Sequence, residues 1–212
     1  MRRRQVGAAL AIVLVLLTAA CSGDDGDALP TPSTIDPADV TTTAPPPDPE
    51  ELPPAGALDL EPIYGAQLEA LGLRLTDRGG LIDRSGGGYA PSAEGTHLAL
   101  YVEPIGDRTL PQYLDGIRSV AVVFGDVFER WPGLVSYDVC QEPTTAADAR
   151  DEPLPVTQIE LTREEAEAID FDTVTVVELV RASLADPPGL ALRVSSAIAR
   201  DPAYLAIVDE AT

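Results

Sequence analysis

The chain has 212 residues, with 14 basic side chains, all of them Arg, against 35 acidic ones, and its net charge is −21. A chain this acidic lacks the clustered basic residues that nucleic-acid binding and anionic lipid headgroups require. Its charge favours solubility and a cationic partner or ligand. The length fits one domain with appended segments.

The first 21 residues are typical of an export signal. Three arginines at positions 2–4 precede an apolar run over residues 6–17, which is shorter than the about 20 residues a membrane-spanning helix needs. The run ends in Leu17-Thr18-Ala19-Ala20-Cys21. This segment resembles the lipobox of bacterial lipoproteins, with Thr18 standing where Leu is commonest. Two readings stay open beside it, namely an ordinary signal peptide with a chance cysteine and an uncleaved membrane anchor.

The resemblance implies a location in the cell, and it implies nothing about the folded domain. In this class the cysteine thiol, here that of Cys21, receives a diacylglyceryl group, and a signal peptidase then removes residues 1–20. The removal takes away three Arg and brings the net charge from −21 to −24. Two acyl chains give stable anchoring, at roughly 0.8 kcal/mol per buried CH₂. Cys140 would then be the one remaining thiol, so no intramolecular disulfide is expected.

Residues 21–56 are predicted to form the lipidated cysteine and a disordered tether. Residues 22–54 contain nine prolines, no Arg and no aromatic residue, a composition that cannot bury enough apolar surface to fold. The prolines favour extended polyproline II, with a reach on the order of 100 Å at full extension. Asp24, Asp25 and Asp27 lack the spacing of a calcium loop. Residues 57–212 are expected to form one extracytoplasmic domain.

The first half of this domain predicts a helix and three strands. A helix is expected from Glu61 to about residue 71, ended by Gly72. Residues 73–77 and 81–84 predict a short hairpin around Arg78-Gly79-Gly80. The segment 97–103 predicts a strand whose Leu and Val side chains share one face and whose other face carries His97.

A long amphipathic helix over about 110–131 is the clearest predicted element. Thr109 and Gln112 have the spacing of a capping box. Apolar residues recur at steps of three and four, which gives one buried stripe: Leu114, Ile117, Ala121, Phe124, Phe128 and Trp131. A strand over 134–141 follows, so strand, helix and strand form a candidate βαβ unit.

The rest of the chain predicts a strand over 156–161 and two helices that open at Thr162 and Thr175. A last strand over 190–194 and a helical end complete the pattern. The whole favours a single α+β domain, a mixed sheet with helices packed on it.

His97 is the only histidine, so a histidine base or a hydrolase triad would have to use it. Serines at positions 85, 92, 119 and 136 are the possible nucleophiles, but no Gly-x-Ser-x-Gly elbow links one of them to His97. The other interpretation is a strand histidine that bonds to a neighbour or to water. Cys140 is a second weak catalytic candidate, although Asp138 and Glu142 nearby would raise its pKa. A small, semi-buried structural thiol is the alternative.

Three further kinds of site are weighed against simpler readings. One His and one free Cys cannot build a typical zinc set, and no carboxylate spacing selects calcium or magnesium, so no metal and no cofactor are predicted. Arg78-Gly79-Gly80 and the glycines at 86–88 suggest anion-binding nests or flexible turns. Tyr89, Tyr101, Tyr113 and Tyr137 suggest either a pocket lining or core packing, and Trp131 is expected in the core.

These observations favour a membrane-anchored, extracytoplasmic domain without catalytic activity that binds an envelope protein, a polymer or a small molecule. A cell-envelope hydrolase that uses His97 is the alternative from a different class. A structural or assembly factor for an envelope complex is the third. Nucleic acid is not an expected partner.

Overall fold

The computed structural model describes residues 48–84, 94–143, 155–185 and 190–212. The predicted signal, Cys21 and most of the predicted tether lie outside these residues, as do Ser85, Ser92, Tyr89 and the glycines at 86–88. Among the helices of the described ranges, none combines the length and the apolar character of a membrane-spanning segment.

The domain is built on a mixed sheet of five strands that lie side by side in chain order. The strands are β1 (Leu73–Asp83), β2 (Thr96–Pro104), β3 (Ser136–Gln141), β4 (Thr157–Thr162) and β5 (Leu190–Val194). β2 and β3 are parallel, and the other neighbouring strands are antiparallel. The helix that joins β2 to β3 makes the predicted βαβ unit, and the α+β class is confirmed.

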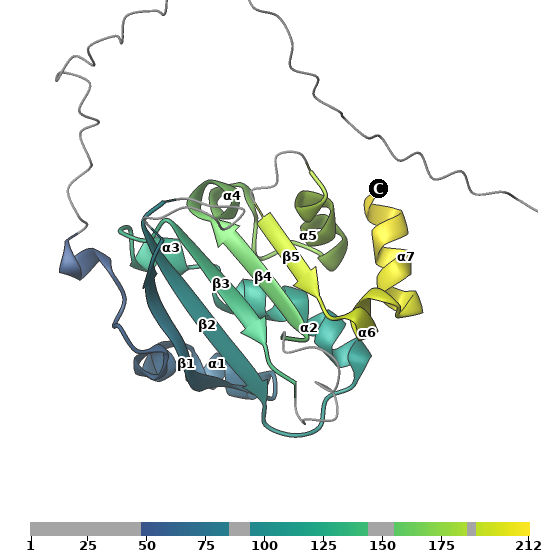
Figure 1. The fold of residues 1–212 in the computed structure, drawn as a ribbon, viewed down its shortest axis with the longest axis horizontal. Helices are drawn as coiled ribbons and strands as arrows, with labels where there is room; N and C mark the ends of the chain where they lie inside the picture. Colours follow the sequence, from purple (N-terminus) through teal and green to yellow (C-terminus); the bar gives the residue numbers. More distant parts are fainter. Residues whose placement is uncertain (1–47, 85–93, 144–154, 186–189) are drawn as a thin grey trace, which may run out of the picture. The chain divides into compact units, whose positions relative to one another are not determined.

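Helices pack on one face of this sheet. They are α1 (Glu61–Ala70), α2 (Leu110–Val123), α3 (Val127–Arg130), α4 (Arg163–Ala168), α5 (Val176–Ser183), α6 (Ser196–Ala199) and α7 (Pro202–Ala211), and two 3₁₀ turns, η2 (Pro49–Glu51) and η3 (Ala57–Leu60), precede them. In Figure 1, α1 and α2 lie behind the strands, and α5 and α7 lie beyond β5. No helix of the described residues covers the face that looks toward the viewer, called here the helix-free face.

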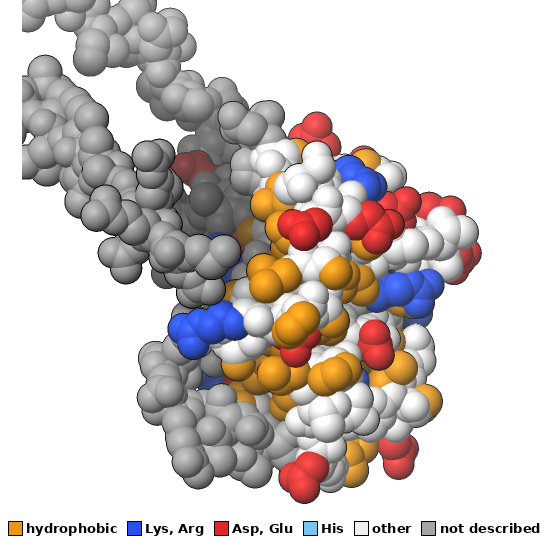
Figure 2. Space-filling view, turned by 90° about the vertical axis from the view of Figure 1, so that its right-hand side faces the viewer, with side chains coloured by type: hydrophobic (Ala, Val, Ile, Leu, Met, Phe, Trp, Pro, Cys, Tyr) orange, Lys and Arg blue, Asp and Glu red, His pale blue; other side chains and the backbone are white. Residues whose placement is uncertain are grey.

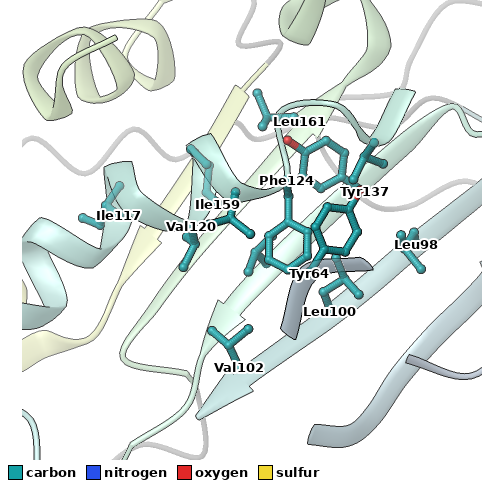
Figure 3. Close-up of a cluster of buried hydrophobic side chains, with 14 of the residues drawn as sticks. Tyr64, Leu98, Leu100, Val102, Ile117, Val120, Phe124, Tyr137, Ile159 and Leu161 are labelled. Atoms are coloured by element: carbon teal, nitrogen blue, oxygen red, sulfur yellow. The ribbon is translucent and has the colours of Figure 1, made fainter. Parts of the chain in front are cut away.

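The core lies between the sheet and its helices. Figure 3 shows Leu98, Leu100 and Val102 of β2 in one cluster with Tyr64 of α1 and with Phe124, which directly follows α2. All six residues of the predicted stripe are buried, which confirms the buried face of the 110–131 segment. Burying one large apolar side chain stabilises a fold by about 1.5–3 kcal/mol, so this stripe holds the helical segment on the sheet.

The predicted helix over 110–131 is interrupted. Thr109 and Gln112 form the predicted capping box, but α2 ends at Val123 and α3 begins only at Val127. Gly125 lies in the break, and a Cβ atom there would be 2.8 Å from the Phe171 ring. The glycine both weakens the helix and lets Phe171 approach closely, so tertiary packing overrides the helical period.

The hairpin predicted around Arg78-Gly79-Gly80 is wrong, because the structure has one strand there. β1 runs from Leu73 to Asp83 along β2, and the pairing shifts register between Leu75 and Gly79. Gly79 has φ +91° and Gly80 has φ +125°. These glycines absorb a β-bulge instead of reversing the chain.

Contacts of the domain begin before residue 57, the boundary predicted from the sequence. The Gly133 amide donates to the Glu51 carbonyl at 2.9 Å, Gly56 bridges to Gly80, and Leu52 packs against the core. The end of the predicted tether therefore belongs to the fold, because one leucine among the prolines supplies apolar surface.

The remaining elements follow the sequence closely. Thr162 caps α4 by accepting from the Glu165 amide, and Thr175 with Glu178 forms a full capping box on α5. β5 is the predicted last strand, and α6 and α7 form the helical end.

Candidate functional site

Polar side chains gather on the helix-free face, at one end of the central strands. This polar cluster consists of Arg84, His97, Ser136, Asp138, Glu160 and Arg193. Strand register brings its members together, because His97 lies opposite Ser136 and Asp138 lies opposite Glu160. Alternation places these side chains on the face opposite the apolar core.

Two hydrogen bonds determine which ring nitrogen of His97 carries the proton in the neutral form. Its Nδ1 lies 2.8 Å from the Ser136 Oγ, and its Nε2 lies 2.9 Å from the Arg84 Nη2. A guanidinium has donors and no acceptor, so Nε2 must accept with its lone pair. In the neutral imidazole the proton then sits on Nδ1 and is donated to Ser136.

Asp138 stands beside this pair with one oxygen unpartnered. Its Oδ2 accepts from the Gln158 side-chain amide at 2.6 Å, while its buried Oδ1 has no hydrogen bond among the described residues. That Oδ1 lies 3.7 Å from the His97 Nε2. This distance is too long for a hydrogen bond while Arg84 occupies Nε2.

Glu160 closes the polar cluster. Its carboxylate is 2% exposed and receives the Arg84 guanidinium, which is 8% exposed, and the half-exposed Arg193 at 3.2 Å. A buried carboxylate needs such paired donors, since an uncompensated buried charge is costly. Arg84 therefore links Glu160 of β4 to His97 of β2.

The structure thus brings His97 and Ser136 together, a pairing that the sequence left open among four serines. The geometry does not make His97 a base for Ser136, because the serine hydroxyl accepts the imidazole proton. Both side chains are completely buried. For a base, Nδ1 would have to lose its proton to Nε2, and Arg84 would have to leave.

Cys140 is not part of this arrangement. It lies opposite Tyr101, four positions along β2 from His97, which is about 13 Å at the rise of a strand. Burial raises the pKa of its thiol, and the carboxylates of Asp138 and Glu142 raise it further. Cys140 is therefore a buried structural thiol that resists ionisation, which was the alternative to a catalytic cysteine. The structure does not support a reactive cysteine at this position.

The other residues singled out in the sequence take structural positions. Trp131, Tyr113 and Tyr137 are buried in the core. The backbone at Gly79 packs so closely that an added Cβ would be 2.3 Å from the Ala99 carbonyl oxygen. Arg78 lies over the Tyr101 ring and pairs with Glu142, so this segment forms no anion nest.

Comparison with protein-family models, with curated proteins and with solved structures finds no match to this chain. The site is therefore interpreted from its own geometry.

A second feature was not predicted from the sequence. A pocket of about 330 Å³ lies where α4, the segment after it and α5 meet. It is lined by Glu165, Ala168, Ile169, Asp170, Thr173, Val174, Glu178, Leu179 and Ala182. Three of these side chains are carboxylates, and no described lining residue is basic. The sequence located both helices by their caps, but it held no signal that the linking segment leaves a hollow between them.

The carboxylates of this pocket do not form a metal centre. Across the described parts of the chain, no group of three His, Cys, Asp or Glu side chains is placed to hold a metal ion. The lining mixes three carboxylates with apolar side chains, which suits an amphipathic ligand better than a bare ion.

Proposed function

We propose that this protein is a lipid-anchored, extracytoplasmic binding domain without catalytic activity. The leader, the small residues before Cys21 and the proline-rich segment support the anchored location. A diacylglyceryl group on Cys21 holds the chain at the outer face of the cell membrane, and the tether lets the domain reach away from it.

The observation that carries the binding role is the pocket between α4 and α5. Its floor is apolar, its lining includes Glu165, Asp170 and Glu178, and it opens at the surface of the domain. In contrast, the groups on the helix-free face that resemble a catalytic set are buried and engaged with each other. His97 donates to Ser136, and Arg84 occupies the other ring nitrogen.

The location is tested by replacing Cys21 in the full chain. In Cys21→Ser the protein should leave the membrane fraction or remain as an uncleaved precursor, while the control Cys140→Ser should stay with the membrane. Intact mass of the wild-type protein should show residues 1–20 removed and a diacylglyceryl group on Cys21. A processed chain that carries a bare Cys21 would refute the anchored location.

A cell-envelope hydrolase is the second candidate, favoured by one specific observation. His97 lies between Ser136 and Asp138. Its Nδ1 is 2.8 Å from the Ser136 Oγ, and its Nε2 is 3.7 Å from the Asp138 Oδ1. If Arg84 withdrew, Asp138 could accept from Nε2–H while Nδ1 accepted the serine proton. The ring nitrogens would then have roles exchanged relative to the usual triad.

A serine-directed fluorophosphonate probe separates the two candidates. The binding proposal expects no labelling of the wild-type protein and none in Arg84→Met, which frees Nε2. Labelling that disappears in Ser136→Ala would establish the hydrolase instead. Urea unfolding of each variant checks that the fold is retained.

A further inference from the structure

The pocket between α4 and α5 combines charge with an apolar floor. Val174 and Leu179 are buried side chains of that floor, and Ile169 and Ala182 are partly buried. Its volume of about 330 Å³ lies at the lower end of the roughly 300–1,000 Å³ typical of small-molecule pockets. A space of this size suits one long side chain better than a large ligand.

The carboxylates of the pocket are held in place by local structure. Glu178 accepts from the Thr175 amide at 2.7 Å and from its hydroxyl at 2.9 Å, and these bonds lower the pKa of the Glu178 carboxyl. Asp170 accepts from the Asp172 amide at 3.1 Å and from the Thr173 hydroxyl at 2.9 Å. Carboxylates oriented in this way present acceptor oxygens to a cation.

Glu165 completes the acidic lining. It belongs to the first turn of α4, and the described residues provide no ion-pair partner for its carboxylate. Three carboxylates without a basic neighbour in the lining repel one another and attract a positive charge. The negative charge of the whole chain would add to that attraction and speed association with a cationic partner.

Exposed apolar side chains also occur outside the pocket, at the end of α5 and on α7. Leu184, two positions after Ala182, is 54% exposed at the end of α5, and Leu205 of α7 is 48% exposed. α5 and α7 pack against each other. Figure 2 shows the side of the molecule that carries them, with hydrophobic side chains gathered among acidic ones.

We propose that this pocket binds a lysine or arginine side chain of a protein partner. The aliphatic stem lies on Val174 and Leu179, and the cationic head meets the carboxylates of Glu165, Asp170 and Glu178. This inference rests on the proposed binding function and names its ligand class.

Blocked peptides test the proposal on the full mature chain in detergent. Three nonapeptides share one Leu- and Gly-based sequence and differ at the central position, which is Lys, Arg or norleucine. Norleucine keeps the apolar stem and removes the charge. The Lys and Arg peptides should bind, and the norleucine peptide should bind at least about 10-fold more weakly in fluorescence anisotropy, since several charge contacts act together.

Neutral isosteres locate the contact. Glu165→Gln and Asp170→Asn keep shape and hydrogen-bond acceptors, so each should weaken binding of the Lys peptide by about 2- to 5-fold, as expected for a partly exposed ion pair. Glu164→Gln is the matched control, because it removes the same charge from α4 at an exposed residue outside the pocket. It should leave the affinity unchanged. Ala182→Leu should fill the pocket and weaken the Lys and norleucine peptides alike.

Each opposite result overturns the inference. Equal binding of the Lys and norleucine peptides would show a purely apolar groove, and an equal loss in Glu164→Gln would show diffuse charge attraction. Absence of binding by all three peptides would remove the ligand class. That failure is distinguishable from failure of the anchored location, which is read from the mass of Cys21 and needs no peptide.

Discussion

Glu160→Gln tests whether the polar cluster stabilises the sheet. The substitution removes the negative charge that pairs with the Arg84 guanidinium, whose side chain is 8% exposed. Removing one member of a buried ion pair costs about 3–5 kcal/mol, and the retained acceptor of Gln places the expected loss near 3 kcal/mol. The contribution of Arg193 is smaller, because its side chain is 50% exposed and screened by water.

Urea unfolding measures this loss. With an m-value of about 2 kcal/mol/M, a loss of about 3 kcal/mol moves the midpoint down by about 1.5 M. Glu103→Gln is the matched control, because the Arg74–Glu103 pair joins β1 to β2 at the surface, with side chains 61% and 37% exposed. An exposed pair is worth about 0–1 kcal/mol, so the control midpoint should fall by at most about 0.5 M.

Salt sharpens the comparison. At 1 M NaCl the effect of Glu103→Gln should vanish, while that of Glu160→Gln should persist, since buried charges are screened little. A midpoint for Glu160→Gln that matches the control, or a loss that salt abolishes, would refute the view that this buried pair holds β4 to β1 and β2.

Three more predictions follow from the fold and the site. Gly79→Ala should lower the free energy of unfolding by about 2 kcal/mol or more, because the positive φ is strained for alanine and the added Cβ would clash with the Ala99 carbonyl oxygen. Gly72→Ala is the control: φ is positive there too, but nothing lies within 4 Å of the added Cβ, so the loss should be only about 1 kcal/mol. Burial raises the pKa of Tyr137 in the folded state above its value of about 10 in the unfolded chain. The stability gained from the neutral phenol is therefore complete below about pH 10. Above that pH the free energy of unfolding should fall by up to about 1.4 kcal/mol per pH unit. Tyr137→Phe should reduce the alkaline slope by the share of one proton, because Tyr64 and Cys140, whose pKa values burial also raises, keep the rest. An unchanged slope in pH-dependent urea unfolding would contradict the assignment. Cys140 should react with a thiol reagent only after denaturation, and rapid labelling of the native protein would show that the thiol is accessible.

Local sequence signals predicted the elements well where side chains act within a few residues. The Thr109–Gln112 and Thr175–Glu178 spacings place helix starts because each cap is closed by residues three apart. The apolar stripe through Ile117 and Phe124 predicts the buried face of the helical segment for the same reason.

Features set by distant contacts could not be predicted. Gly79 and Gly80 signal a turn in any local reading, and only the pairing of β1 along β2 makes them a bulge. The break at Gly125 depends on Phe171, which lies far along the chain. A helix predicted by period alone therefore ran through it.

The candidate sites divide in the same way. The sequence marked His97 and Cys140 by residue type, but the serine partner and the role of Arg84 emerge from register across three strands. The acidic pocket escaped prediction because the spacing of Glu165, Asp170 and Glu178 follows no motif. The shape of the pocket depends on how α4 and α5 pack against the sheet.

The order of the strands has a consequence for how the molecule is made. From β2 to β5, every strand pairs with the strand synthesised immediately before it. A chain that emerges amino terminus first, from a ribosome or a translocation pore, therefore never has to hold a gap open for a strand still to come. Each newly released strand adds to the edge of the sheet that has already formed. Folding can therefore proceed as the chain emerges, and few aggregation-prone, partly folded states are exposed.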